Sequence, residues 1–389
     1  MNAQDLEHQH HFQVYNRFPV TLSKGLGATV WDIHGTPYID ALGGIAVNNL
    51  GHCHPKVVQA IKAQSEQLLH VSNFYYTEAQ SAFIQKLAEI TPGLDRVFLC
   101  NSGVEAMEAC VKLARKWGKA KGKSGNMITL SNGFHGRSVT TITMGKASYQ
   151  EGFDPLPSGF EQVPFNDFDA LKAAANDQTL AIAFETVQGS GGLHVIDPEF
   201  MQQTRALCDE LEILLIIDEV QCGVGRTGTF WAYEQYDIVP DVVAAAKALA
   251  GGIPVGAVMA REEIASALSF GQHGTTFGGN PFTAAVSLAT LHAIEEEGIV
   301  EQAAEKGAFM MNLLKDELAG IETVVDIRGL GLMIGVELSV PGRPVVERMF
   351  EQRVLSNAAA GNVVRLVPPL VITEAQIRQV VGALKQALS

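Results

Sequence analysis

The chain is poor in positive charge and has no paired-cysteine pattern. Its 28 Lys and Arg residues face 42 Asp and Glu, a formal net charge of −14 at pH 7. This balance argues against a nucleic acid or an anionic membrane as the main partner. The five cysteines are an odd number without a C-x-x-C pair, so they fit the reduced thiols of a cytosol better than a disulfide framework.

Long apolar runs and a secretion signal are also missing. No uninterrupted apolar stretch approaches the length that spans a bilayer. The first seven residues, MNAQDLE, lack the basic-then-apolar order of a signal peptide. Together with the charge and the cysteines, these absences predict a cytoplasmic globular protein.

What the chain does contain is a long alternation of short apolar runs and helical patterns. The runs lie at 96–100, 127–130, 180–184 and 213–217. Continuous apolar strands that alternate with amphipathic helices predict an α/β fold, with a mainly parallel sheet covered by helices on both faces. After about residue 285 the pattern changes to one typical of a smaller α+β domain.

The length of the chain and the change in its sequence pattern predict how it divides into domains. At 389 residues with 47% hydrophobic content, two or three domains are expected. We expect an N-terminal segment (1–50) that joins the small domain, a large domain (51–285) and a small C-terminal α+β domain (286–389). Pro55 is expected to open a helix that ends near His70, and Thr77 to cap the next one.

Two charged residues, Asp218 and Lys247, stand inside strongly apolar sequence, which is costly unless each has a partner or a task. One cofactor needs both. Pyridoxal phosphate is held as a Schiff base by a lysine, and an acid opposite its ring nitrogen keeps that nitrogen protonated. Taken alone, each residue is better explained as a strand end or a solvated side chain. The neighbouring motifs reverse that preference.

Two small-residue turns could bind a phosphate. In Asn101-Ser-Gly-Val-Glu105, Ser102 can cap a helix and Glu105 can complete a capping box, which leaves backbone N–H groups at a helix N-terminus. The segment 275–281, TTFGGNP, offers hydroxyls and a permissive backbone. An ordinary cap and a plain Gly-rich turn are the structural alternatives.

Aromatic and cationic side chains suit a flat, anionic ligand. Phe134 could stack on a planar cofactor, and Arg137 could grip a carboxylate with two hydrogen bonds. Arg365 lies inside the apolar run 363–369, where an arginine needs an anion or an acidic partner. The alternatives are a solvated surface arginine and a structural salt bridge.

Two other patterns carry little weight. Residues 223–228 match G-x-G-x-x-G, but they neither follow a strand directly nor open a helix, so a dinucleotide site is not expected. The histidines at 52 and 54, and at 8, 10 and 11, lack the spacing of a zinc site, and we expect no metal.

Together the motifs resemble the class III (ornithine-type) aminotransferases, pyridoxal-phosphate enzymes of fold type I. The similarity runs from Tyr15 to the final helix. The motifs that carry it are GHCHP (51–55), NSGVEA (101–106), FHGR (134–137), VQG (187–189), DEVQ (218–221), GRTG (225–228), HGTTFGGNP (273–281) and RLVPPL (365–370). Within the class, the stretches 134–137, 165–167 and 328–335 are most similar to enzymes that act on N-acetylornithine, whereas 112–118 is similar to ornithine enzymes.

The resemblance implies roles around the cofactor. Lys247 would form the Schiff base and move the proton, and Asp218 would hold the ring nitrogen. The remaining cofactor-binding residues it implies are Ser102, Gly103 and Val104 at the phosphate, Thr276 at the phosphate from the partner subunit of a homodimer, Phe134 on the ring, His135 beside it, Gln221 at the ring hydroxyl, and Glu185 near Gln221.

For the substrate, the resemblance implies that Arg137, helped by Tyr15, binds one carboxylate. Arg365 would bind the second carboxylate of 2-oxoglutarate or glutamate. One position departs from the family: Ser190 stands where relatives have a glutamate that masks this arginine for donors without a carboxylate there. The departure bears directly on which amines are donors.

The resemblance therefore implies a homodimeric aminotransferase with shared active sites. It would move the terminal amino group of N-acetylornithine to 2-oxoglutarate in arginine biosynthesis. Ornithine, succinylornithine, succinyl-diaminopimelate and 4-aminobutyrate remain alternative donors. A dinucleotide-dependent oxidoreductase and a non-catalytic scaffold are the alternatives of other classes.

Overall fold

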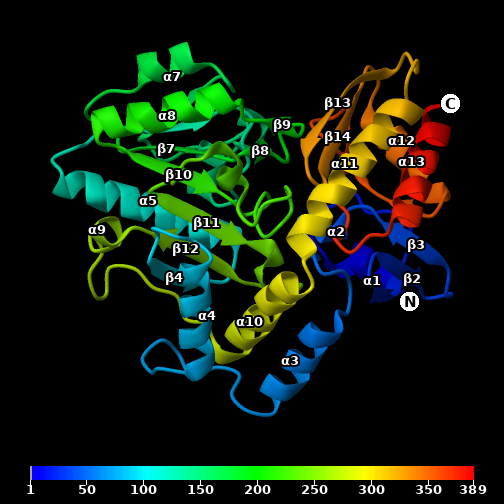
Figure 1. Cartoon of the computed structure of the whole chain (residues 1–389), viewed down its shortest axis with the longest axis horizontal. Helices are drawn as coiled ribbons and strands as arrows, with labels where there is room; N and C mark the ends of the chain where they lie inside the picture. Colours follow the sequence, from blue (N-terminus) through cyan, green and yellow to red (C-terminus); the bar gives the residue numbers. More distant parts are fainter. Residues whose placement is uncertain (1) are drawn as a thin grey trace.

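A seven-stranded sheet forms the centre of the protein, in a computed structural model that describes residues 2–389 (Figure 1). In spatial order its strands are β4 (Arg96–Cys100), β12 (Gly256–Ala260), β11 (Val242–Ala246), β10 (Leu214–Asp218), β7 (Ala181–Phe184), β5 (Met127–Leu130) and β6 (Phe160–Val163). Only β12 is antiparallel to its neighbours. The prediction of a mainly parallel sheet is confirmed.

The side chains on the two faces of the sheet pack into two separate hydrophobic cores. In β10, Leu215 and Ile217 pack with Phe200 of α8 (Pro198–Leu211), whereas Leu214 and Ile216 join the core under α5 (Gly103–Ala120). Successive strand residues point to opposite faces, so a strand that is apolar throughout needs helices on both sides. Figure 1 shows α5 and α8 in these places, with α7 (Phe168–Ala174) beside α8.

Three helices form a layer at the bottom of Figure 1. The helix α10 (Pro281–Glu296) packs against α3 (Pro55–Ser65) and α4 (Glu78–Glu89). Thr77 caps α4 as predicted, because its hydroxyl accepts from the Gln80 backbone. The prediction that the first of these helices reaches His70 is wrong. After Ser65 the chain turns toward the Gly-rich segment, where the His70 ring packs on Phe277 at 5.0 Å.

The C-terminal part contains a second sheet, of order β13-β14-β17-β16. Its strands are β13 (Val324–Leu330), β14 (Met333–Leu338), β17 (Val363–Leu366) and β16 (Asn357–Ala359), and its helices are α11 (Ile299–Glu317), α12 (Gly342–Glu351) and α13 (Glu374–Leu388). These elements lie at the right of Figure 1, apart from the large sheet.

The N-terminal segment joins this small domain through a third sheet. Its strands are β1 (Leu22–Leu26), β2 (Thr29–Asp32), β3 (Pro37–Asp40) and β15 (Val354–Leu355), with β15 parallel to β3. The strands β2 and β3 form an antiparallel hairpin, and β1 pairs with β2. The helix α10 packs on the large domain, and Gly298, with φ 58°, separates it from α11. We therefore propose that the small domain begins near Gly298 and not at 286.

Short elements complete the description. They are α1 (Ala3–His10), α2 (Gly43–Ala46), α6 (Val139–Thr143), α9 (Glu262–Ala265), the 3-10 turns Ala147–Tyr149, Ala232–Tyr236 and Lys247–Ala250, and the hairpin of β8 (Val187–Gln188) and β9 (His194–Val195). None of the helices found in residues 2–389 combines the length and apolarity that a bilayer crossing requires.

A buried arginine holds the two domains together. Arg226, in the segment that matches G-x-G-x-x-G, donates to the carbonyls of Leu332 (2.9 Å) and Pro368 (2.6 Å) and to Asn49 Oδ1 (2.7 Å). Burial lowers its pKa to about 9. The glycines beside it pack closely on the small domain, since a Cβ at Gly228 would lie 3.1 Å from Ala304 Cβ. This segment therefore serves as a packing junction in the fold.

Candidate active site

The candidate site lies at the carboxyl edge of the large sheet. Asp218 is the last residue of β10, Lys247 follows β11 directly, and Glu185 follows β7. Because these strands are parallel neighbours, their carboxyl ends meet at one edge, where α/β proteins bind ligands. A cavity of about 440 Å³ opens there. It brings together most of the predicted site residues: Ser102, Gly103, Val104, Phe134, His135, Arg137, Glu185, Asp218, Gln221 and Lys247.

Lys247 has a strained backbone and an unpaired amine. Its φ of 46° lies in the left-handed region, which a lysine adopts only where the surroundings impose it. Within residues 2–389 its Nζ has no hydrogen-bond or salt-bridge partner. Burial lowers the pKa of Lys247, although the charges of Asp218 and Glu185 raise it in part. A lysine amine with a lowered pKa is a better nucleophile at neutral pH.

Asp218 is held by a buried histidine. His135 Nδ1 lies 2.7 Å from Asp218 Oδ2, and the two side chains are 1% and 3% exposed. Asp218 Oδ1 accepts from the Val220 backbone at 3.0 Å. Burial lowers the pKa of His135, but the hydrogen bond and charge of Asp218 outweigh it and leave that pKa raised. The pair therefore fixes the Asp218 carboxylate at the wall of the cavity.

Glu185 and Gln221 form a second polar group in this wall. Glu185 accepts from the backbone N–H groups of Phe134 (3.0 Å) and Gly189 (3.2 Å). Burial raises the pKa of Glu185 to about 7. Gln221 Oε1 is buried without a partner in the described chain, and a Cβ at Gly189 would overlap it. The glycine is required for this close approach, and the free oxygen is left for a ligand.

The turn at Ser102 presents a helix N-terminus to the cavity. Ser102 caps α5, because its hydroxyl accepts from the Glu105 backbone at 3.3 Å. The prediction that Glu105 completes a capping box with Ser102 is wrong. Glu105 Oε2 accepts from the backbone and side-chain N–H groups of Asn101, one residue before the cap. The first-turn N–H groups of Gly103 and Val104 remain without carbonyl partners in the helix, which suits a phosphate.

Aromatic side chains surround Arg137 at another part of the cavity wall. The Arg137 guanidinium lies 3.9 Å from the centre of the Tyr149 ring, and Phe134 meets that ring edge-on at 5.8 Å. Arg137 is exposed, so its donors are free to turn toward a carboxylate. Tyr149 was not predicted from the sequence, because it lies 12 residues after Arg137 in a short 3-10 turn without a motif.

Arg365, in the small domain, and Ser190 are not among the residues that line this cavity. Arg365 is buried in β17 and contacts the loop at Gly189, next to the cavity residue Gln221. Its Nε donates to Asn357 Oδ1 at 3.0 Å and its Nη1 to the Gly189 carbonyl at 3.3 Å. Asn357 was not predicted from the sequence as a site residue. Its position eight residues before Arg365, across a tight hairpin, was the available signal.

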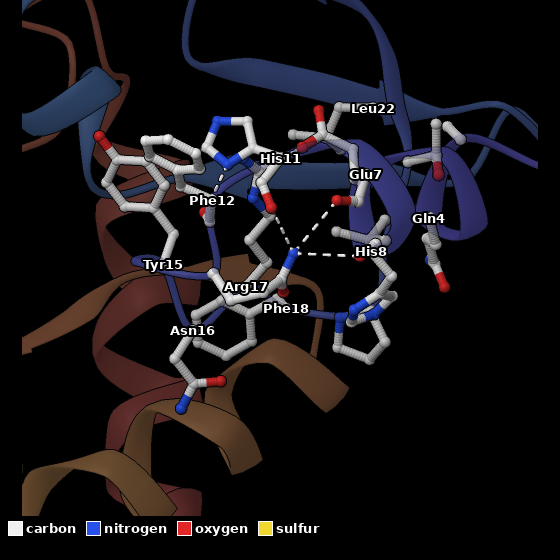
Figure 2. Close-up of a pocket in the computed structure, with 15 residues that line it drawn as sticks. Gln4, Glu7, His8, His11, Phe12, Tyr15, Asn16, Arg17, Phe18 and Leu22 are labelled. Atoms are coloured by element: carbon white, nitrogen blue, oxygen red, sulfur yellow. Dashed lines mark hydrogen bonds and ion pairs between the residues drawn. The ribbon is translucent and has the colours of Figure 1, made fainter.

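Two predicted site residues lie elsewhere in the single chain. Tyr15 lines a separate cavity of about 510 Å³ formed by residues 3–22, beside His11 and Arg17 (Figure 2). Thr276 is exposed, on a shallow pocket with Asn73 and Asn280. Their roles at an active site stay predictions.

The polar groups that line the cavity suit the binding of pyridoxal phosphate. The buried Asp218 carboxylate would hold a ring nitrogen, and the Lys247 amine, which has no partner within residues 2–389, would hold an aldehyde. The unpartnered Gln221 Oε1 suits a ring hydroxyl, and the Ser102 turn suits a phosphate. The chemistry expected of Asp218 and Lys247 from sequence is therefore compatible with the geometry.

Comparisons with known proteins identify the family of the chain. Residues 12–388 match the family aminotransferase class-III. The acetylornithine aminotransferase of Methanocaldococcus jannaschii is 49% identical over 388 residues, which cover 99% of this chain and 97% of that protein.

Two solved structures are similar over nearly the whole chain. One is an ornithine aminotransferase of Toxoplasma gondii with partial occupancy of PLP at its active site (TM-score 0.94, 34% identity, 99% of this chain and 93% of that one). The other is the acetylornithine aminotransferase of Elizabethkingia anophelis (TM-score 0.88, 33% identity, 99% and 97%). The chain belongs to the class III aminotransferases, the family of pyridoxal-phosphate enzymes that its motifs resemble.

Proposed function

We propose that this aminotransferase moves the terminal amino group of N-acetylornithine to 2-oxoglutarate, giving a semialdehyde and glutamate, in arginine biosynthesis. The observation that carries the reaction type is the placement of Lys247 and Asp218 at adjacent carboxyl ends of β11 and β10, in one cavity with the Ser102 turn. The donor rests on full-length similarity to relatives named acetylornithine aminotransferase.

Each residue of the site has a separate role in the proposed reaction. Bound pyridoxal phosphate supplies an aldehyde for amines and an electron-withdrawing ring. Lys247 would hold that aldehyde and would serve as the base that moves a proton during the reaction. Asp218, fixed by His135, supplies the negative charge opposite the ring nitrogen. Phe134 covers the ring and the Ser102 turn binds the phosphate.

Two arginines recognise the substrates. Arg137 binds the α-carboxylate of N-acetylornithine, assisted by Tyr15, and Arg365 binds a carboxylate of 2-oxoglutarate. The cavity of about 440 Å³ has room for a cofactor ring and a five-carbon chain.

The working unit is a homodimer in the cytoplasm. Phe74 and Tyr76 are 92% and 100% exposed, and Phe277 is 60% exposed. The two loops that carry these aromatic residues contact each other, because Asn73 Nδ2 donates to the Thr275 carbonyl at 3.1 Å. Clustered exposed aromatics are typical of an interface. We place a second copy of the chain on them, which lets Thr276 reach the partner's phosphate site. The five free cysteines, four of them buried, fit a reducing compartment.

A mixing experiment tests the shared site. Lys247→Ala and Thr276→Ala enzymes should each be strongly impaired. After subunit exchange the mixed dimers should regain partial activity, because one of their two sites has both residues intact. Proven mixed dimers without recovery would show that each subunit builds its own site.

A donor screen tests the reaction. The purified enzyme, saturated with pyridoxal phosphate, is given 2-oxoglutarate and one of several amines: N-acetylornithine, ornithine, succinylornithine, succinyl-diaminopimelate or 4-aminobutyrate. Glutamate formation should have its highest kcat/KM with N-acetylornithine. A tenfold or larger preference for another amine would reassign the donor, and no glutamate from any amine would refute the reaction.

A further inference from the structure

The strand pairing places Asn357 directly opposite Arg365. The two residues are Cα partners in the antiparallel pair of β16 and β17. Opposite residues of an antiparallel pair point to the same face of a sheet, and the Arg365 Nε donates to Asn357 Oδ1 at 3.0 Å. Asn357 therefore fixes one edge of the guanidinium from the neighbouring strand.

A loop of the large domain fixes the other side. Arg365 Nη1 donates to the Gly189 carbonyl at 3.3 Å. That loop is itself held at two points, because Glu185 accepts from the Gly189 N–H and the Gly192 carbonyl accepts from Arg328 Nε at 2.9 Å. The guanidinium thus lies between two fixed neutral oxygens.

The two arginines of this sheet differ in charge compensation. Arg328 forms salt bridges with Asp326 (2.8 Å) and Glu337 (2.6 Å). In the part of the chain that the structure describes, residues 2–389, Arg365 forms none, although it is buried. Ser190, beside its Gly189 contact, carries no charge. The burial lowers the pKa of Arg365 to about 10, in line with a cation that lacks a paired anion.

We propose that Asn357 is a positioning residue for carboxylate binding: its amide oxygen orients Arg365 without neutralising it, so that the whole positive charge is left for a substrate carboxylate. This inference rests on the proposed function. It means that 2-oxoglutarate and glutamate bind without first displacing a charged side chain. Glutamate should consequently be a good donor in the reverse direction, and discrimination against α-amino donors should be weak.

The test changes the charge of the Arg365 partner. Asn357→Asp supplies a carboxylate at the same place, Asn357→Leu removes the acceptor at similar volume, and Ser190→Glu adds a carboxylate in the loop next to Gly189. The two half-reactions are measured separately in single turnovers on the holoenzyme. The binding of glutarate, a five-carbon dicarboxylate that cannot react, is measured by calorimetry. Asn176→Asp, at an exposed loop position, is the matched control for added charge.

With Asn357→Asp and Ser190→Glu, the KM for 2-oxoglutarate and the Kd for glutarate should rise by about tenfold or more, as expected for a competing charge-assisted contact. Asn357→Leu should raise both by several-fold. The half-reaction with N-acetylornithine should change by less than about twofold in all three, and Asn176→Asp should behave as wild type.

Equal effects on the two half-reactions, or unchanged glutarate binding in Asn357→Asp, would overturn the positioning role. A wild type that uses N-acetylornithine poorly but binds glutarate with this dependence on Asn357 would refute only the proposed donor.

Discussion

His135 offers a sharp test of how the site keeps its negative charge, because its only polar contact in the described chain is with Asp218. Replacement of His135 by Phe keeps a ring in the buried position but removes the N–H that lies 2.7 Å from Asp218 Oδ2. The carboxylate is then left with the Val220 backbone N–H as its remaining donor. We expect the Asp218 carboxylate, no longer fixed on this side, to hold a protonated ring nitrogen less well.

The size of the effect follows from the type of contact. A hydrogen bond to a charged group contributes about 1.5–3 kcal/mol, and both side chains are almost fully buried, so solvent does not replace it. Every 1.4 kcal/mol is about tenfold in a rate or binding constant. The His135→Phe enzyme should therefore lose roughly 10- to 150-fold in kcat/KM. His135→Asn, which retains a donor, should lose less.

The assay is kcat/KM with N-acetylornithine and 2-oxoglutarate from pH 6 to 9, with cofactor content and circular dichroism measured in parallel. The loss in kcat/KM should be present throughout this pH range, with cofactor content and fold unchanged. A His135→Phe enzyme with wild-type kcat/KM across this range, fully loaded and folded, would refute the role of the pair.

Three further predictions concern single residues. Lys247→Ala should remain folded but lose nearly all turnover and the yellow, pH-sensitive absorbance of a lysine-bound cofactor; retained turnover would contradict its role. Arg226→Met removes the donor from three buried oxygens and should lower the free energy of unfolding in urea by at least about 3 kcal/mol, whereas a loss below about 1 kcal/mol would contradict a junction role. Burial raises the pKa of Glu219 to about 8, from about 4.5 in the unfolded chain. Glu219 therefore contributes its full stabilisation below pH 4.5, and this stabilisation is lost as the pH rises through about 8. Wild type should therefore lose stability relative to Glu219→Gln between pH 5 and 9 in urea titrations, and parallel curves would contradict this.

The sequence predicted the architecture where one strong local signal decided it. Apolar runs such as 213–217 must be buried on both sides, so they specify inner strands of a covered sheet. Ser102 is a favourable cap directly after a strand, and the helix begins there. Asp218 and Lys247 stood out because a charge inside an apolar run needs a reason. Parallel pairing then brings their strand ends together.

What the sequence did not predict depends on contacts between distant segments. Glu105 accepts from the backbone and side chain of Asn101 and not from the cap residue. Asn357 gains its role only through the register of β16 and β17. The close packing of Arg226 on Leu332 and Pro368 carries no local pattern either. Such residues look ordinary until the fold places their partners.

The most direct test of the central claim follows the nitrogen itself. N-acetylornithine labelled with ¹⁵N at its terminal amine is incubated with the holoenzyme and unlabelled 2-oxoglutarate, and the products are analysed by mass spectrometry. The proposed function predicts that the label appears in glutamate, with one glutamate formed for each semialdehyde. Release of the label as ammonia, or unlabelled glutamate only, would contradict an amino-group transfer through Lys247 and Asp218.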